Sequence, residues 1–391
     1  MRSYPRSYWL MCFNVLLFFI SFNMLLPELN AYITTLGGAD YKWTVLGLWT
    51  ITALFMRPFS GKIADNLGRK KVMYIGICIS IVVSFLYPVF RFLTGFFMLR
   101  LLHGASTGFH PTGATALVAD YIPPGKRGQA MGIFSALVAI GFSAGQGLGS
   151  PVKQAFGMDG LFYTCGGLGI ASLLLLAFID EDKSKLNKIE GSVWKNIIPK
   201  PSEIISPNVF KPAVIMLITA AIAGVYMFIV PEFSEHLNIE NKGSFYLYNV
   251  LFVVIVRVFA GRLADTFGPT NNLYFGLTLI IVAACVTGTA TTSGQFLFSS
   301  ILYGIAAGVI SPSLFAWTAD LSDPRYKGRG MATLFLSLEA GFFIGAFMTQ
   351  QIYRNDAANF FKLFMVVAGL SLIGLVYLFL ANVLSKKKTH E

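Results

Sequence analysis

Charged residues are scarce in this chain. Aspartate, glutamate, lysine and arginine together make up 13% of its 391 residues, whereas hydrophobic residues make up 55%. A water-soluble protein of this length needs a much larger charged surface. The composition therefore excludes a soluble fold for most of the chain and predicts that its surroundings are lipid.

Cysteine is rare as well. The four cysteines stand singly in separate apolar stretches, at Cys12, Cys78, Cys165 and Cys285. Their spacing matches no metal site, so we interpret them as packing residues. The first apolar run lacks a small-residue cleavage pattern, and we interpret it as an uncleaved helix.

The motifs of an ATP-driven pump and of a membrane enzyme are also missing. No glycine-rich phosphate loop is present, which argues against direct use of ATP. His103 and His110 are the only histidines inside apolar stretches, and no two acidic residues share the centre of one. Without a histidine–carboxylate cluster or a nucleophile with its base, we expect neither an enzyme nor a bound cofactor or metal.

Long apolar stretches are the main feature that the sequence does contain. A helix needs about 20 apolar residues to cross a bilayer. Twelve stretches approach this length, at residues 8–31, 43–60, 72–90, 95–119, 129–152, 160–179, 212–233, 244–260, 272–290, 296–319, 329–352 and 359–383. We therefore expect an all-α membrane protein with twelve transmembrane helices.

The basic residues are unevenly distributed between the two sides of these stretches. If the N-terminus is cytoplasmic, 21 of the 30 lysines and arginines lie in inner segments and 6 in outer ones. An excess of inner positive charge predicts an inner-membrane protein with both termini in the cytoplasm. It also explains the net charge of +11 without nucleic acid as a partner.

The two halves of the chain repeat one another. Six residues recur after 200 positions: Arg57, Phe59, Gly61, Ala64, Asp65 and Gly68 return as Arg257, Phe259, Gly261, Ala264, Asp265 and Gly268. The longest polar stretch separates the halves. We expect two pseudo-symmetric six-helix bundles, residues 1–180 and 212–391, joined by a cytoplasmic linker at 181–211.

A charged loop joins the second and third apolar stretches. It reads Gly61-Lys-Ile-Ala-Asp65-Asn-Leu-Gly68-Arg69-Lys70-Lys71, with glycines that permit a tight turn. The loop resembles the signature of the major facilitator superfamily, and the copy around Asp265, which lacks the trailing basic residues, resembles the degenerate second signature. The resemblance covers essentially the whole chain and is greatest to the twelve-helix drug and metabolite proton antiporters.

The resemblance implies roles for individual residues of this loop. In that family the loop aspartate and arginine form a charge network with an acid at the end of the fourth helix. The matching residues are Asp65, Arg69 and Asp120, and the implied role is gating. A loop that only fixes the topology is the alternative.

Polar residues line one face of the fourth stretch. Arg100, His103, Thr107 and His110 fall at i, i+3, i+7 and i+10 of a helix. Such a face must meet protein or water. The segment resembles the family's second motif, in which a buried arginine is associated with proton coupling, although His103 replaces the usual glutamine. The histidines are candidates for protonation or, equally, for interhelical hydrogen bonds.

The fifth stretch contains Gly141-Phe-Ser-Ala-Gly145-Gln146-Gly147-Leu-Gly149. This run resembles the glycine-rich motif associated with the family's antiporters, except that Gln146 replaces the usual proline. The resemblance implies antiport. Close packing of small residues between helices explains the same glycines and is compatible with that role.

Two acidic residues complete the set of candidates for proton coupling. Glu28 ends the first stretch after a proline, and we expect it either to approach Arg100 or to sit in water at the outer rim. Glu339 follows Gly328 by 11 residues, which places it about 16 Å into a core of about 30 Å. Desolvation there favours the neutral carboxylic acid, which can carry a proton.

These features together predict a secondary transporter that works by alternating access. We expect proton-coupled export of a small molecule by a monomer in the lipid bilayer, with protons as the second partner. Uptake of a small anion, with Arg100 as its counter-charge, is the alternative. A receptor or scaffold is a different class that no dedicated soluble domain supports.

Overall fold

The fold was examined in a computed structural model of the chain. It describes the backbone of residues 4–122, 127–181, 197–199, 204–322 and 327–388. Inside these ranges, the side chains of Asp65 and of residues 127–129, 258–267, 327–329 and 383–388 lie outside the description. The chain divides into two compact units, residues 1–201 and 202–391, and each is described by itself.

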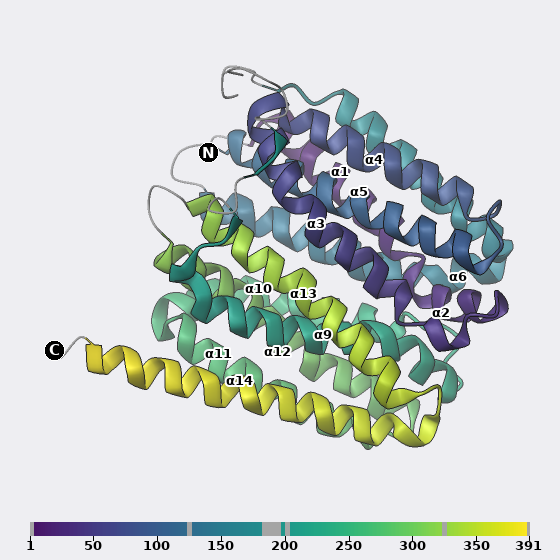
Figure 1. The fold of residues 1–391 in the computed structure, drawn as a ribbon. Coiled ribbons are helices and arrows are strands. Elements are labelled where there is room, and N and C mark those ends of the chain that lie inside the picture. Colours follow the sequence, from purple (N-terminus) through teal and green to yellow (C-terminus); the bar gives the residue numbers. More distant parts are fainter. Residues whose placement is uncertain (1–3, 123–126, 182–196, 200–203, 323–326, 389–391) are drawn as a thin grey trace. The chain divides into compact units, whose positions relative to one another are not determined.

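Unit 1 is a bundle of long helices (Figure 1). They are α1 (Arg6–Asn23), α2 (Leu26–Thr35), α3 (Thr44–Leu67), α4 (Arg69–Leu86), α5 (Leu93–Asp120) and α6 (Arg127–Ala177), with a 3-10 turn at Ala39–Tyr41. The first expected stretch is divided between α1 and α2 just before Pro27. Helix α6 contains the fifth and sixth stretches, which meet at Gly157, where φ is 72°.

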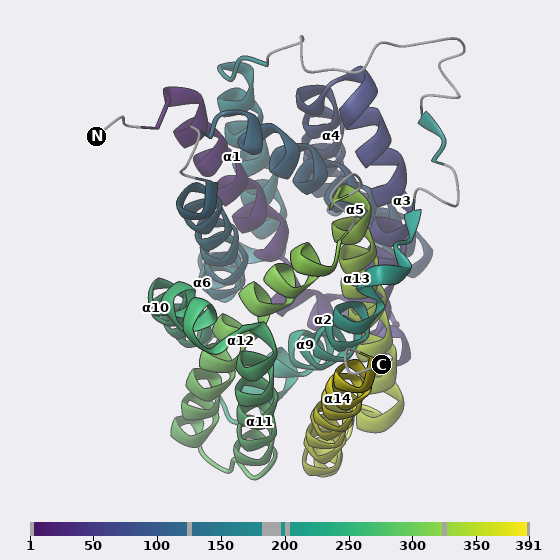
Figure 2. The same cartoon turned by 90° about the vertical axis from the view of Figure 1, so that its left-hand side faces the viewer.

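Unit 2 repeats this arrangement. Its helices are α9 (Phe210–His236), α10 (Ser244–Phe267), α11 (Pro269–Gly288), α12 (Ser293–Leu321), α13 (Lys327–Tyr353) and α14 (Phe360–Lys388), with 3-10 turns at Pro207–Val209 and Ala357–Asn359. Helix α11 packs against both α12 and α14, as the two views show (Figures 1 and 2). All regular structure among the described residues is helical, which confirms the all-α fold.

Each of the twelve expected stretches lies on a helix. By length and composition, seven helical segments of the described residues can cross a membrane, and Ser244–Arg257 is a shorter apolar helix. One of the seven, Ala130–Ala177, contains the break at Gly157 and provides two passes. Large apolar side chains such as Phe156 and Phe178 are about 70% exposed, as expected for a surface that faces lipid.

Glycines set the closest helix contacts inside unit 1. A Cβ atom added at Gly145 of α6 would lie within 3.0 Å of the Ile20 carbonyl oxygen on α1. A Cβ at Gly104 of α5 would collide in the same way with the Trp49 carbonyl oxygen on α3. Only glycine permits backbones to approach so closely, so these residues fix the helix pairs α1–α6 and α3–α5.

The same glycines act in unit 2 after 200 residues. Gly345 of α13 lies against the Ala221 carbonyl on α9, and Gly304 of α12 lies against the Asn249 carbonyl on α10. The repeat seen in the sequence therefore corresponds to the same pair of close contacts in each unit. The glycine-rich run of the fifth stretch packs helices together, as one of its two interpretations predicted.

Substitution of Gly145 by alanine is expected to destabilise the protein. The new methyl group meets backbone atoms of α1 that cannot move alone, and overpacking of this kind costs about 1–3 kcal/mol. The melting temperature in detergent measures the loss. Gly167→Ala on the same helix is the matched control, because a Cβ there meets nothing within 4 Å. Equal melting temperatures for the two variants would contradict the packing role.

Candidate functional site

Arg100 is fully buried in the first third of α5. Its Nε donates to the carbonyl oxygen of Val45 at 2.8 Å, Nη2 donates to the same oxygen, and Nη1 lies 3.5 Å from the Tyr87 hydroxyl. The guanidinium also stacks about 6 Å from the Phe22 and Trp49 ring centres. A charge at this depth is tolerated only with such partners. No carboxylate pairs with Arg100 among the described residues.

The two histidines of α5 make interhelical hydrogen bonds. His103 Nε2 lies 3.2 Å from the Ser80 hydroxyl on α4. His110 Nε2 lies 2.9 Å from Asn14 Oδ1 on α1, and the His110 ring stacks on Phe18. Because Asn14 uses its Nδ2 to donate to Ser172, its oxygen is left to accept, so His110 carries a proton on Nε2.

The polar face of α5 is buried inside unit 1 along its whole length. Thr107, the remaining member, accepts a hydrogen bond of 2.6 Å from Trp49 Nε1. Arg100, His103, Thr107 and His110 are all at most 4% exposed. The prediction that this face meets protein or water is confirmed, and here it meets α1, α3 and α4.

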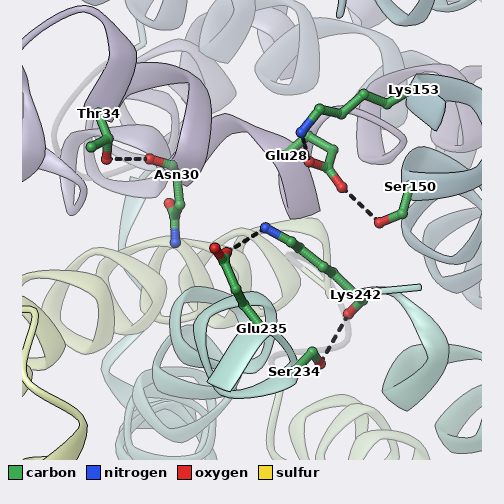
Figure 3. A network of polar contacts seen from close by, with 8 residues as sticks. All are labelled: Glu28, Asn30, Thr34, Ser150, Lys153, Ser234, Glu235 and Lys242. Atoms are coloured by element: carbon green, nitrogen blue, oxygen red, sulfur yellow. Dashed lines mark hydrogen bonds and ion pairs between the residues drawn. The ribbon is translucent and has the colours of Figure 1, made fainter. Parts of the chain in front are cut away.

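Glu28 takes part in a buried ion pair at the start of α2 (Figure 3). Its carboxylate oxygens lie 2.6 Å from Lys153 Nζ and 2.6 Å from the Ser150 hydroxyl, both on α6. The Glu28 side chain is 2% exposed, so it does not sit in water at a rim. The expected approach to Arg100 is also wrong, because each residue has other partners.

Glu339 lies near the middle of α13 and is 3% exposed. The position of Glu339 deep in the apolar stretch therefore corresponds to a side chain that is buried in the structure. Two turns of the same helix carry Gly341 and Gly345, which pack against α9. The carboxyl group thus lies on a helix that packs closely against α9.

Among the charged loop residues, the structure brings Arg69 and Asp120 together. Arg69, at the start of α4, forms an ion pair with Asp120 at the end of α5. The side chains of Asp65 and Asp265 lie outside the described residues. Gly68 has a φ of 121° between α3 and α4, a conformation that favours glycine. Gly61 lies inside α3 and not in the turn, which corrects the expectation for that glycine.

Sequence reasoning missed Glu181, which follows the sixth stretch. Its Oε1 accepts hydrogen bonds from the backbone amides of Arg69 at 2.6 Å and Lys70 at 3.3 Å, the first residues of α4. Lys70 Nζ in return donates to the carbonyls of Ile179 and Ala177 at the end of α6. A carboxylate at a helix N-terminus and an ammonium at a C-terminus are both favoured by the helix dipole.

The residues that form this reciprocal cap are not repeated in the sequence of unit 2. At the positions 200 residues later, Pro269 and Thr270 replace Arg69 and Lys70, and Ala381 replaces Glu181. Next to the cap, burial and the nearby carboxylates Asp180 and Glu181 raise the pKa of the Tyr121 hydroxyl to about 12. The only available signal for Glu181 was an acidic residue directly after an apolar stretch, which many linkers also show.

The whole chain was then compared with known proteins. It matches the family description "Major Facilitator Superfamily" over residues 11–287 and 243–391. The chain belongs to the major facilitator superfamily. It is therefore a multi-pass membrane transporter and not an enzyme.

Individual relatives are distant. The quinolone resistance protein NorA of Staphylococcus aureus is 23% identical over 384 residues, which is 95% of each chain. An MFS-type transporter of Methanocaldococcus jannaschii, MJ1560, is 23% identical over 93% of this chain and 95% of its own. Among solved structures, the human organic anion transporter MFSD10 superposes with a TM-score of 0.76 at 18% identity, covering 96% of this chain and all of that one.

Removal of the cap at α4 is expected to lower stability modestly. Glu181→Gln removes the charge from two hydrogen bonds at a helix N-terminus, each contribution being about 1 kcal/mol at a partly exposed site. Asp180→Asn is the matched control, since this neighbouring carboxylate is exposed. Thermal unfolding of both variants at pH 7 measures the difference. If Asp180→Asn lowers the melting temperature as much as Glu181→Gln, the cap is not the cause.

Substitution of Lys153 is expected to lower the stability of the protein more than removal of the cap at α4. Lys153→Met leaves the buried Glu28 carboxylate without its cation, and because the Lys153 side chain is 37% exposed we expect a loss of about 1–3 kcal/mol, below that of a fully enclosed pair. The double variant Glu28→Gln/Lys153→Met should recover most of the melting temperature. The Lys242–Glu235 pair of unit 2, drawn in Figure 3, is the comparison: Glu235 is 65% exposed, so Lys242→Met should matter less. Additive losses in the double variant would argue against a Glu28–Lys153 interaction.

Proposed function

We propose that this transporter exports a small molecule across the inner membrane in exchange for protons, by alternating access. The observation that carries the proposal is Glu339, a carboxyl group 3% exposed inside an apolar helix. A carboxyl group in the apolar interior can bind and release a proton during the transport cycle, which changes its charge in surroundings that disfavour charge. Similarity to the quinolone resistance protein NorA supports export and quinolones as test substrates.

The other candidates for proton coupling fit structural roles better. His103 and His110 hold α5 to α4 and α1 through hydrogen bonds of the kind that a neutral ring makes. Glu28 already pairs with Lys153. We assign the main coupling role to Glu339, because it is a carboxyl group buried near the middle of an apolar helix.

Arg100 is better suited to fix the bundle than to bind an anion. Two of its nitrogens donate to the Val45 carbonyl, and its faces cover aromatic rings. A guanidinium that is fully buried in unit 1 and held against the α3 backbone is poorly placed for a carboxylate or phosphate of a substrate. Anion uptake with Arg100 as counter-charge is therefore the less favoured function.

We further propose that the end of unit 1 that carries the Arg69–Asp120 pair faces the cytoplasm, together with both termini. The excess of basic residues in the segments at that end supports this orientation. There the ion pair, with Asp65 and Asp265 of the two loops, acts as a gate. The protein works as a monomer with a small molecule and protons as its partners.

Neutralisation of Glu339 is expected to uncouple transport. In vesicles with the purified protein, Glu339→Gln should reduce quinolone flux driven by a pH gradient at least tenfold, because the amide cannot exchange a proton. Exchange of labelled for unlabelled quinolone without a gradient should persist. Glu339→Asp, which keeps a carboxyl group, and Glu28→Gln should retain gradient-driven flux. Unchanged driven flux in Glu339→Gln would refute the assignment.

A further inference from the structure

Gln146 stands on a polar face of α6 in unit 1. Gln146, Ser150 and Lys153 follow one another at i, i+4 and i+7, which places them on one side of the helix. Ser150 and Lys153 both contact Glu28. Gln146 lies about 6 Å along the helix axis from Ser150. It is the member of this face that has no contact with Glu28 in the structure.

The amide of Gln146 is buried without any hydrogen bond. Its side chain is 1% exposed, and neither Oε1 nor Nε2 has a partner within the described part of the chain. Asn23 at the end of α1 is fully buried, and its Oδ1 likewise has no partner there, although its Nδ2 donates to the Phe19 carbonyl at 2.8 Å. The neighbouring Gly145 holds the two helices together here, since its Cβ would lie 3.0 Å from the Asn23 Cβ.

Such groups are exceptional inside a protein. The large majority of buried side-chain polar atoms are hydrogen-bonded, and an amide without a partner costs about 1–3 kcal/mol. The adjacent Ser150, Lys153 and Glu28 obey this rule. The Gln146 amide is therefore able to gain hydrogen bonds from a group outside the chain.

The second repeat shows that the fold does not require an amide at this position. Ala346 occupies the equivalent place on α13, 200 residues after Gln146, and is fully buried. Gly345 packs against α9 there just as Gly145 packs against α1. The helix pair therefore closes with an apolar residue at this site, so Gln146 serves something other than packing.

We propose that Gln146 and Asn23 form a subsite for an uncharged group of the transported molecule that both donates and accepts hydrogen bonds, such as a carboxamide, a lactam or an alcohol. Gln146 Nε2 would donate to it, and Gln146 Oε1 and Asn23 Oδ1 would accept from it. Glu28 and Lys153, at the next positions of the same polar face, pair with each other and leave no net charge there, so the subsite suits a neutral group. The inference rests on the proposed carrier function and adds a substrate class to it.

The test compares two probes on purified protein in detergent. Chloramphenicol is uncharged and carries a secondary amide and two hydroxyl groups, whereas tetraphenylphosphonium has no hydrogen-bonding group. Chloramphenicol should raise the melting temperature of the wild type. Gln146→Leu and Gln146→Ala, the latter introducing the residue found in the second repeat, should weaken its binding at least tenfold. Any binding of tetraphenylphosphonium should stay the same.

The melting temperature without a probe separates this role from a structural one. Because the amide has no partner in the chain, both variants should melt at or above the wild-type temperature. A clear decrease would mean that Gln146 holds a structural water molecule and would overturn the subsite. Absence of chloramphenicol binding by the wild type, or equal binding by the variants, would overturn it as well. Either result leaves driven flux through Glu339, and so the proposed function, intact.

Discussion

Lipid offers no hydrogen bonds, and this constraint accounts for most of the polar contacts in the structure. A polar side chain within the bilayer must find its partner in the protein. Arg100 reaches a backbone carbonyl on α3, His110 reaches an asparagine on α1, and Glu28 reaches a lysine on α6. Each of these contacts also joins two helices. The same side chains that are costly in lipid therefore determine which helices of unit 1 neighbour one another.

The constraint also explains why the two repeats differ. Their glycines make the same contacts, because helix pairs need a close approach wherever they cross. Their polar residues do not make the same contacts in the two units, because each polar group needs a hydrogen-bond partner only in its own surroundings. Unit 1 joins the ends of α4, α5 and α6 through Arg69, Lys70 and Glu181. Unit 2 begins α11 with Pro269, whose nitrogen needs no partner, and so dispenses with the cap.

Much of the fold was predictable from the sequence, because helices that lie in lipid are recognised from the length and spacing of their apolar and polar residues. The helices follow from apolar length, and the buried face of α5 follows from the spacing of Arg100 and His110. The contact partners of the polar side chains were harder to predict from the sequence. Lys153 is 125 residues from Glu28. The partner of Arg100 is a carbonyl, which every residue possesses and which no side chain identifies. Glu181 was missed because a residue after an apolar stretch reads as linker, and Gly61 was misplaced because a glycine inside a helix gives the same signal as one in a turn.

Hydrogen-bond partners help to distinguish the polar residues that stabilise the fold of such a protein from those that bind the transported molecule. A residue whose polar side-chain atoms all have partners within the chain, such as Glu28 with Ser150 and Lys153, loses contacts whenever it binds something else. A residue whose hydrogen bonds are incomplete, such as Gln146, gains them. The position of Gln146 supports the proposed subsite, because the related motif has a proline here, and proline has no side-chain donor or acceptor. Glutamine at this position adds an amide that can donate and accept hydrogen bonds inside the bundle, and the proposed subsite gives that amide a partner during transport.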